Sequence, residues 1–204
     1  CDGVAWVDGW PASHRGVIVA NEVLDALPVE RFVRRRGWVM QLCVIVDGER
    51  FAMTERPAPD YLESAVQGIE QDLGRPLPDG YVSDVCAAVP QWIADLATAL
   101  REGTAFLFDY GVSRKEYYAA DRNGGWLRCH FRHHAHNDAL LLPGIQDITP
   151  GVDFTAVAVA AADNEFDIIK KYFTFSAISD DVLIAVGDDC ASVRVPGNKQ
   201  LVIT

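Results

Sequence analysis

The stretch Gly16-Val17-Ile18-Val19-Ala20-Asn21-Glu22-Val23-Leu24-Asp25-Ala26-Leu27-Pro28 decides the fold of this chain. Its apolar run from Val17 to Ala20 is typical of a strand buried on both faces. Asn21, Glu22 and Asp25 follow at once in a short helix or turn that Pro28 ends. Because open α/β sheets build their sites beyond the carboxyl ends of their strands, this stretch predicts a candidate site as well as a strand.

A second unit of the same kind follows further along the chain. Thr104–Phe108 is predicted to be another buried strand, with Asp109 and Tyr110 at its carboxyl end. The apolar periodicity before it predicts a helix that Ser83 caps, with a kink or a late start at Pro90 and an end at Gly103. A helix followed by an apolar strand is typical of a parallel α/β sheet.

Between these two units the residue pattern changes to segments rich in β-forming residues. Residues 29–56 are predicted to form a small antiparallel insertion, with a hairpin turn at Asp47-Gly48. Asp60–Leu73 then has the apolar spacing of an amphipathic helix.

The segment 112–150 is long, polar and poor in regular patterns, so we predict a functional loop or lid. It contains four histidines, at positions 130, 133, 134 and 136, which with Asp138 could bind zinc. The absence of an HExxH motif or a cysteine pair, and the nearby Arg128 and Arg132, favour a structural or substrate-side role. After it, Asp153 is predicted to cap a helix, and β-like segments follow from Ile168 to Thr204.

Length and composition narrow the class of protein. A chain of 204 residues, 50% hydrophobic and 23% charged, suits a single globular domain over 1–204. Its net charge of −11 argues against nucleic acid or anionic membranes as partners. Five scattered cysteines favour a reducing, intracellular setting. Because the chain begins with Cys1, we expect that an amino-terminal portion is absent from it.

The polar residues at the strand ends allow two interpretations. Asn21, Glu22 and Asp25 could bind an arginine side chain, since carboxylates meet the guanidinium fork bidentately. They could equally serve as helix caps and as a first-turn charge. Asp109 and Tyr110 could likewise line the same crevice. Asp109 could instead be a capping residue, and Tyr110 a packing residue.

Three segments together resemble the MidA-type family of S-adenosylmethionine-dependent methyltransferases. Ala20–Pro28 resembles its NE-x-x-DALP signature, and Phe108–Gly111 its DYG strand end. Leu127–His136, Pro143–Thr149 and Val152–Phe154 resemble its LR-x-H…H…PG-x-x-DIT-x-x-VDF tract, so the resemblance covers residues 16–162. Mitochondrial members of that family are protein arginine methyltransferases that assist assembly of respiratory complex I.

The resemblance implies an α/β class I methyltransferase fold, a Rossmann-like sheet with flanking helices, whose first strands and glycine-rich cofactor loop are not in this sequence. It implies S-adenosyl-L-methionine as cofactor, no metal, and a protein substrate methylated at arginine. The location would be the cytoplasm in a bacterium or the mitochondrial matrix in a eukaryote, and a homodimer is left open. The residues it assigns are Asn21, Glu22 and Asp25 as catalytic, Asp109 and Tyr110 as cofactor-binding, and His130, His134, Asp147, Thr149 and Asp153 as substrate-side or loop residues.

Two competing interpretations remain open from the sequence. One is a non-catalytic interaction or assembly module that kept the methyltransferase fold, which the missing glycine-rich loop favours. The other is a metal-dependent hydrolase built on the histidine segment. The resemblance fades after about Ala162, where the fold is left open.

Overall fold

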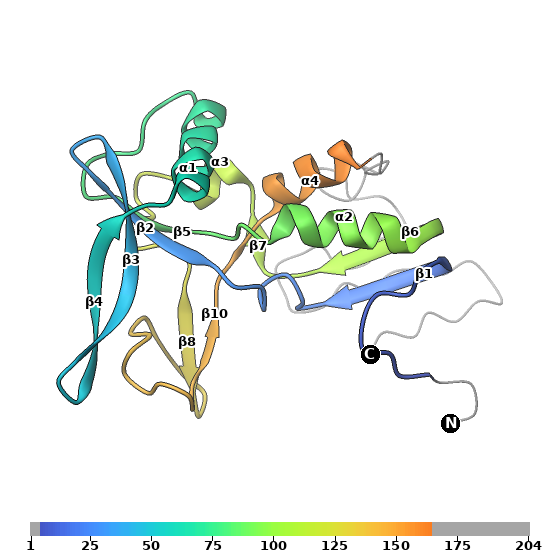
Figure 1. Ribbon diagram of the computed structural model, residues 1–204, viewed down its shortest axis with the longest axis horizontal. Coiled ribbons are helices and arrows are strands. Elements are labelled where there is room, and N and C mark those ends of the chain that lie inside the picture. Colours follow the sequence, from blue (N-terminus) through green and yellow to red (C-terminus); the bar gives the residue numbers. More distant parts are fainter. Residues whose placement is uncertain (1–4, 165–204) are drawn as a thin grey trace, which may run out of the picture. The chain divides into compact units, whose positions relative to one another are not determined.

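Two parallel strands carry the candidate site at their carboxyl ends: β1 (His14–Asn21) and β6 (Leu100–Phe108). In the computed structural model, which describes residues 5–164, they pair in register from Val17 opposite Thr104 to Asn21 opposite Phe108 (Figure 1). Helix α2 (Val89–Ala99) precedes β6, and helix α4 (Phe154–Asp163) packs against α2. The predicted unit of strand, helix and parallel strand is therefore present.

The expectation that both strands are buried on both faces is wrong for the described residues. Val17, Val19, Phe106 and Phe108 are between 44% and 65% exposed. Val19 pairs with Phe106, so these side chains share one face of the two-stranded sheet, while the alternate residues are half-buried. The reason is that α2 packs against β6 from one side only, and no second layer covers the other face within residues 5–164.

A four-stranded antiparallel sheet forms the second part of the described fold. It contains β2 (Glu30–Arg35), β3 (Trp38–Asp47), β4 (Arg50–Pro57) and β5 (Val82–Val85), in the order β4-β3-β2-β5. The predicted hairpin turn at Asp47-Gly48 joins β3 to β4, and Gly48 has the positive φ of +62° that such a turn requires. The antiparallel strands expected within residues 29–56 are thus present.

The main hydrophobic core lies between this sheet and two helices. Helix α1 (Asp60–Leu73) has the predicted bounds and buries Leu62, Val66 and Ile69. It ends at Gly74, whose φ of +65° is the left-handed conformation common after a helix. The short helix α3 (Arg114–Tyr117) adds Tyr117 to the same core, where it joins Phe32 of β2. This part of the chain therefore has its own packed interior.

The second helix differs from its prediction. Ser83 does not cap it but lies fully buried in β5, which pairs with β2 from Glu30 opposite Val85 to Val33 opposite Val82. Helix α2 begins only at Val89, with Pro90 in its first turn, where a missing N–H costs nothing. The late start is confirmed, but the helix ends at Ala99 rather than Gly103.

Short elements occupy the segment that the sequence showed as irregular. They are β7 (Gly111–Val112), α3, β8 (Arg128–Phe131), β9 (His134–His136), β10 (Asp147–Thr149) and β11 (Val152–Asp153). The three strands in the middle form an antiparallel sheet in the order β10-β8-β9, and β11 pairs parallel with β7. This segment is thus organised by strand pairing.

Two further points concern the limits of the described chain. No helix within residues 5–164 is both long and apolar enough to cross a membrane. The β-like segments predicted between Ile168 and Thr204 lie outside the described residues.

Candidate active site

The polar residues that follow β1 and β6 lie next to each other. The parallel register places Asn21 opposite Phe108, and the Glu22 backbone N–H donates to the Phe108 carbonyl at 2.8 Å. Glu22 has a φ of +50°, in the left-handed region that non-glycine residues seldom adopt. Such backbone conformations cluster at functional sites, where the surroundings hold them in place.

Asp109 fixes the turn that follows β1. Its Oδ2 accepts hydrogen bonds from the backbone N–H groups of Leu24 at 2.8 Å and Asp25 at 3.2 Å. Its Oδ1 accepts from the N–H of Tyr110 at 2.8 Å. The end of β6 thereby sets the position of the Asp25 side chain, a contact between residues 84 apart in the sequence.

Asp25 is the most buried carboxylate of the group, with 8% of its surface exposed. Burial raises the pKa of its carboxyl, because the charged form loses contact with water. Nearby negative charge raises the pKa further, and it comes from Asp109, Glu22 and Asp147. We call Glu22, Asp25, Asp109 and Asp147 the acidic cluster.

The acidic cluster has no cation to balance it among the described residues. None of the ion pairs found within residues 5–164 includes one of its four carboxylates. The pKa of Asp25 is raised first by its burial and then by this excess of negative charge. The cluster is therefore suited to bind a cationic group.

Asp147 reaches the cluster from β10, and the histidines lie in the same small sheet. His130 of β8 is opposite Asp147, while His134 begins β9 after a two-residue turn. Both histidine side chains are exposed, and Thr149 is half-buried. Arg132 and His133 form the turn with φ of +47° and +65°, the left-handed values that a two-residue hairpin requires.

Strand pairing therefore explains the spacing of the histidines. Within the described part of the chain, no three histidine, cysteine or acidic side chains gather as metal ligands.

Asp153 has a different place from the other predicted residues. Its Oδ1 accepts from the N–H groups of Thr155 and Ala156, which caps α4 as predicted. Its Oδ2 accepts from Arg114 Nε at 2.8 Å, and Arg114 also pairs with Asp72. These contacts give Asp153 a structural role, and it does not contribute to the charge around Asp25.

Tyr110 lies at the edge of the acidic cluster. It is 69% exposed, and its backbone is tied to Asp109. An exposed aromatic ring on the residue next to Asp109 can cover part of a ligand.

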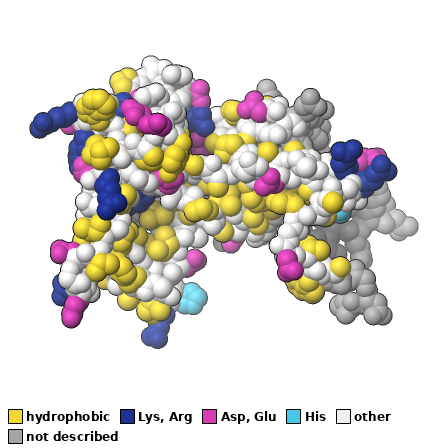
Figure 2. Space-filling model, viewed as in Figure 1, with side chains coloured by type: hydrophobic (Ala, Val, Ile, Leu, Met, Phe, Trp, Pro, Cys, Tyr) yellow, Lys and Arg dark blue, Asp and Glu magenta, His cyan; other side chains and the backbone are white. Residues whose placement is uncertain are grey.

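Sequence reasoning missed an apolar groove that opens beside Asp25. It has a volume of about 550 Å³ and begins at the turn Asp25–Pro28. The side chains that give it its apolar walls are Leu42, Val44, Met53, Leu127, Ile148 and Pro150. Figure 2 shows hydrophobic side chains gathered over the β3–β4 hairpin, the source of one wall. The apolar run in β3 is a local signal for one wall, whereas the opposite wall comes from a distant segment.

Sequence reasoning also missed Asp84, a fully buried carboxylate in β5. It accepts from Arg31 Nε at 2.8 Å and from the N–H groups of Trp126 and Leu127 at 2.8 and 3.2 Å. Arg31 also donates to the Gly124 carbonyl at 2.6 Å. This network ties the segment before β8 to the antiparallel sheet, and so supports the groove wall at Leu127.

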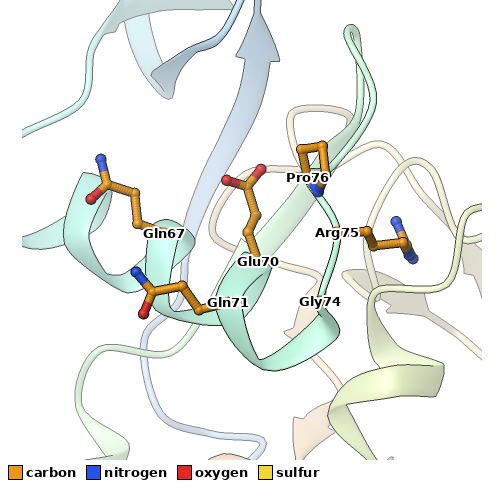
Figure 3. A pocket seen from close by; sticks show the side chains of 6 residues that line it. All are labelled: Gln67, Glu70, Gln71, Gly74, Arg75 and Pro76. Carbon is orange, nitrogen blue, oxygen red and sulfur yellow. The ribbon is translucent and has the colours of Figure 1, made fainter.

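A second depression, of about 400 Å³, lies at the end of α1 (Figure 3). Its central carboxylate, Glu70, already accepts from Arg34 Nη2 at 2.9 Å and from the Leu77 N–H at 2.9 Å. Arg75 donates to the Tyr118 carbonyl. Because these groups are occupied by structural contacts, the acidic cluster is the better candidate.

Known proteins resemble this chain over most of its length. The profile of a family described as "Putative S-adenosyl-L-methionine-dependent methyltransferase" matches residues 2–170. A mitochondrial protein arginine methyltransferase of Danio rerio, NDUFAF7, is 30% identical over 154 residues, 72% of this chain. A Burkholderia thailandensis protein crystallised with S-adenosyl-homocysteine is 34% identical, with a TM-score of 0.71 over 79% of this chain.

These relatives are longer than the chain. It spans 32% of the Danio rerio protein and 41% of the Burkholderia protein. A 44-residue stretch, 21% of the chain, is also 54% identical to thiamine-monophosphate kinase of Haemophilus influenzae and covers 13% of that enzyme. The family profile spans both β1 and β6, the strands whose carboxyl ends lead into the acidic cluster.

Proposed function

The chain belongs to the MidA-type family of S-adenosyl-L-methionine-dependent methyltransferases, and on this premise we propose that its acidic cluster is the acceptor-side wall of a methyl-transfer site. The acceptor is the side chain of an arginine in a protein. The single observation that carries the proposal is the excess of carboxylates around Asp25, with no ion-pairing cation in the described part of the chain. An arginine guanidinium supplies both the missing charge and a fork of donors.

Glu22 and Asp25 have different roles in this proposal. Glu22 is exposed and binds the incoming guanidinium, whereas the buried Asp25 orients the nitrogen that is methylated. When a methyl group joins that nitrogen, the nitrogen gives up a proton. The raised pKa of Asp25 makes it a better proton acceptor than an ordinary carboxylate. The side-chain amide of Asn21 adds a hydrogen-bond donor and a hydrogen-bond acceptor to the acceptor side of the site.

The residues beyond β6 suit the cofactor side of the crevice. S-adenosyl-L-methionine carries a positive sulfonium and a positive amine, and it supplies an electrophilic methyl group when bound. Of the cluster, Asp109 lies beyond β6 and complements that charge, so this carboxylate fits the group. Tyr110 would cover the ligand with its exposed ring, and Asp109 holds the turn that separates the cofactor from the acceptor. Positioning of this kind accounts for much of the catalysis of transfer between two bound groups.

The acceptor class has two supports beyond the cluster itself. The net charge of −11 favours encounters with basic protein segments. The Danio rerio relative carries the name of a protein arginine methyltransferase, which makes arginine the first acceptor to test.

The test uses the 204-residue chain, radiolabelled S-adenosyl-L-methionine and three peptides that differ only in a central arginine, lysine or citrulline. We expect label in the arginine peptide alone, and calorimetry should show binding of S-adenosyl-homocysteine. Binding of this ligand without transfer to arginine would contradict the acceptor. No binding would contradict the cofactor side of the proposal.

Two conservative variants test the roles within the acidic cluster. Asp25→Asn should lower methyl transfer by about 100-fold, since general acid–base groups typically contribute factors of this size. Glu22→Gln should lower methyl transfer by weakening the binding of the arginine peptide. Among the described residues neither carboxylate takes part in an ion pair, so the thermal midpoint of Glu22→Gln should stay near that of the wild type, and that of Asp25→Asn should not fall below it. The matched control is Glu102→Gln, at the amino-terminal part of β6, which should transfer methyl groups normally. Unchanged transfer in both cluster variants would refute the assigned roles.

A further inference from the structure

One face of the β3–β4 hairpin is apolar and exposed. Val44 pairs with Met53 and Val46 with Phe51, so the four side chains point to the same side of the two strands. Their exposed fractions are 53%, 42%, 70% and 49%. Contiguous exposed apolar side chains of this kind mark interaction surfaces more often than single ones do. We call these four residues the hairpin face.

The hairpin face continues into the apolar groove. Val44 and Met53 belong to both, and the groove then runs between Leu42 on one wall and Ile148 on the other toward Asp25. An apolar track therefore leads from the hairpin to the acidic cluster.

Negative charge along this track is concentrated at its inner end. Glu30 also lines the groove, but its carboxylate already accepts from Gln41 Nε2 and from the Tyr61 hydroxyl, both at 2.6 Å. Arg31 is paired with Asp84. The hydrogen bonds from the neutral Gln41 and Tyr61 leave the charge of Glu30 in place, so the track carries one carboxylate along its length and several at the acidic cluster where it ends.

We propose that the hairpin face and the groove dock the acceptor protein, as an extended segment whose apolar side chains precede or follow the arginine that is methylated. The inference rests on the proposed function and adds the sequence around the arginine as the determinant of specificity. From Leu42 to Val46 is about 13 Å at the usual rise of a strand, which about four extended residues span. The apolar part of the acceptor segment thus extends over about four residues.

The charge complementarity and the continuity with the site favour this occupant over a second copy of the chain. A copy would cover the hairpin face but would bring no required cation to Asp25. The acceptor segment covers the apolar hairpin face and also brings a cation to the acidic cluster.

The experiment uses three fluorescently labelled 12-residue peptides with one central arginine. One has a Leu-Val-Leu triplet on the amino-terminal side, one has it on the carboxyl-terminal side, and one has serines in both places. Fluorescence anisotropy with the 204-residue chain should show one apolar peptide binding at least tenfold more tightly than the serine peptide. Methyl transfer should show the same preference.

The variant with Val46→Ser and Phe51→Ser should lose this preference without losing its fold, because both side chains are largely exposed. The matched control is Val17→Ser with Val19→Ser, which removes equally exposed apolar side chains from β1, away from the groove. Sedimentation velocity on each protein detects a second copy as the occupant.

The outcomes separate the docking inference from the proposed function. Equal binding of all three peptides, no binding, or a preference that survives in the hairpin variant overturns the docking surface, even where methyl transfer occurs. The docking surface is also overturned if the wild type shows no peptide preference and forms a dimer that is lost only in the hairpin variant. Preferential binding with no transfer to any arginine supports the docking surface and refutes the acceptor chemistry alone.

Discussion

At the scale of single residues, Asp25 links the stability of the protein to pH. Its pKa is raised above the ordinary value of 3.8, so the folded state holds its proton more tightly than the unfolded state does. Between 3.8 and the raised folded pKa, each rise in pH therefore lowers the free energy of unfolding, and the effect levels off once Asp25 is ionised in both states. The ionised carboxylate of Asp25, which serves the proposed site, thus lowers the free energy of unfolding.

The Asp25→Asn variant should lack the loss of stability that ionisation of Asp25 causes. Its free energy of unfolding, minus that of the wild type, should grow as pH rises above 3.8 and then reach a plateau. Urea unfolding of both proteins from pH 3.5 to pH 8 measures the difference, and all other titrating groups cancel in it to first order. A difference that is constant across this range would contradict the described surroundings of Asp25.

Asp84 stabilises the fold through its contacts, since its buried carboxylate pairs with Arg31 and accepts from two backbone N–H groups. Asp84→Ala removes the partner of Arg31 and the acceptor of two backbone N–H groups, and should destabilise the protein by about 3 kcal/mol. Urea unfolding followed by the fluorescence of Trp126 and the other tryptophans measures this. The matched control is Glu55→Ala, which breaks a solvent-exposed pair with Arg35 and should have little effect. Equal effects of the two substitutions would show that the Asp84 network adds little.

At the scale of elements, local signals predicted what local interactions decide. The 3.6-residue spacing of apolar side chains fixed α1 at Asp60–Leu73, and the Asp-Gly dipeptide fixed the β3–β4 turn. Ser83 was misread because a serine before an apolar helical pattern also suits a cap, while its strand exists through pairing with β2, about 50 residues earlier. Pairing between strands that are distant in the sequence cannot be detected from a short stretch of it.

The candidate site was predictable to the same limited extent. The parallel strand ends brought Asn21 and Glu22 beside Asp109, as the sequence indicated. The negative charge that Asp147 adds at Asp25, and the groove between β3 and β10, depend on a small sheet whose strands are only three or four residues long. Strands this short carry too few residues for an alternating pattern to be seen.

At the scale of the whole described chain, the well-packed core and the candidate site lie in different layers. Most of the fully buried aromatic and aliphatic side chains lie in or next to the antiparallel sheet, α1 and α3, among them Phe32, Leu62 and Tyr81. The two strands that lead into Glu22, Asp25 and Asp109 have one apolar face open instead. Burial of apolar surface is the main stabilising contribution, so the two layers should differ in local stability.

Native-state hydrogen exchange should reveal this difference. The backbone amides of β2, β3 and α1 should exchange only through global unfolding, whereas those of β1 and β6 should exchange through an opening of lower free energy. Helix α2 is an internal comparison, since it buries Ile93 and Leu96 while it packs beside β6. Adding S-adenosyl-homocysteine should slow exchange in β1 and β6 selectively, because a ligand stabilises the state it binds. Equal protection in both layers, unchanged by this ligand, would contradict both the described distribution of the core and the place of the site on its less stable part.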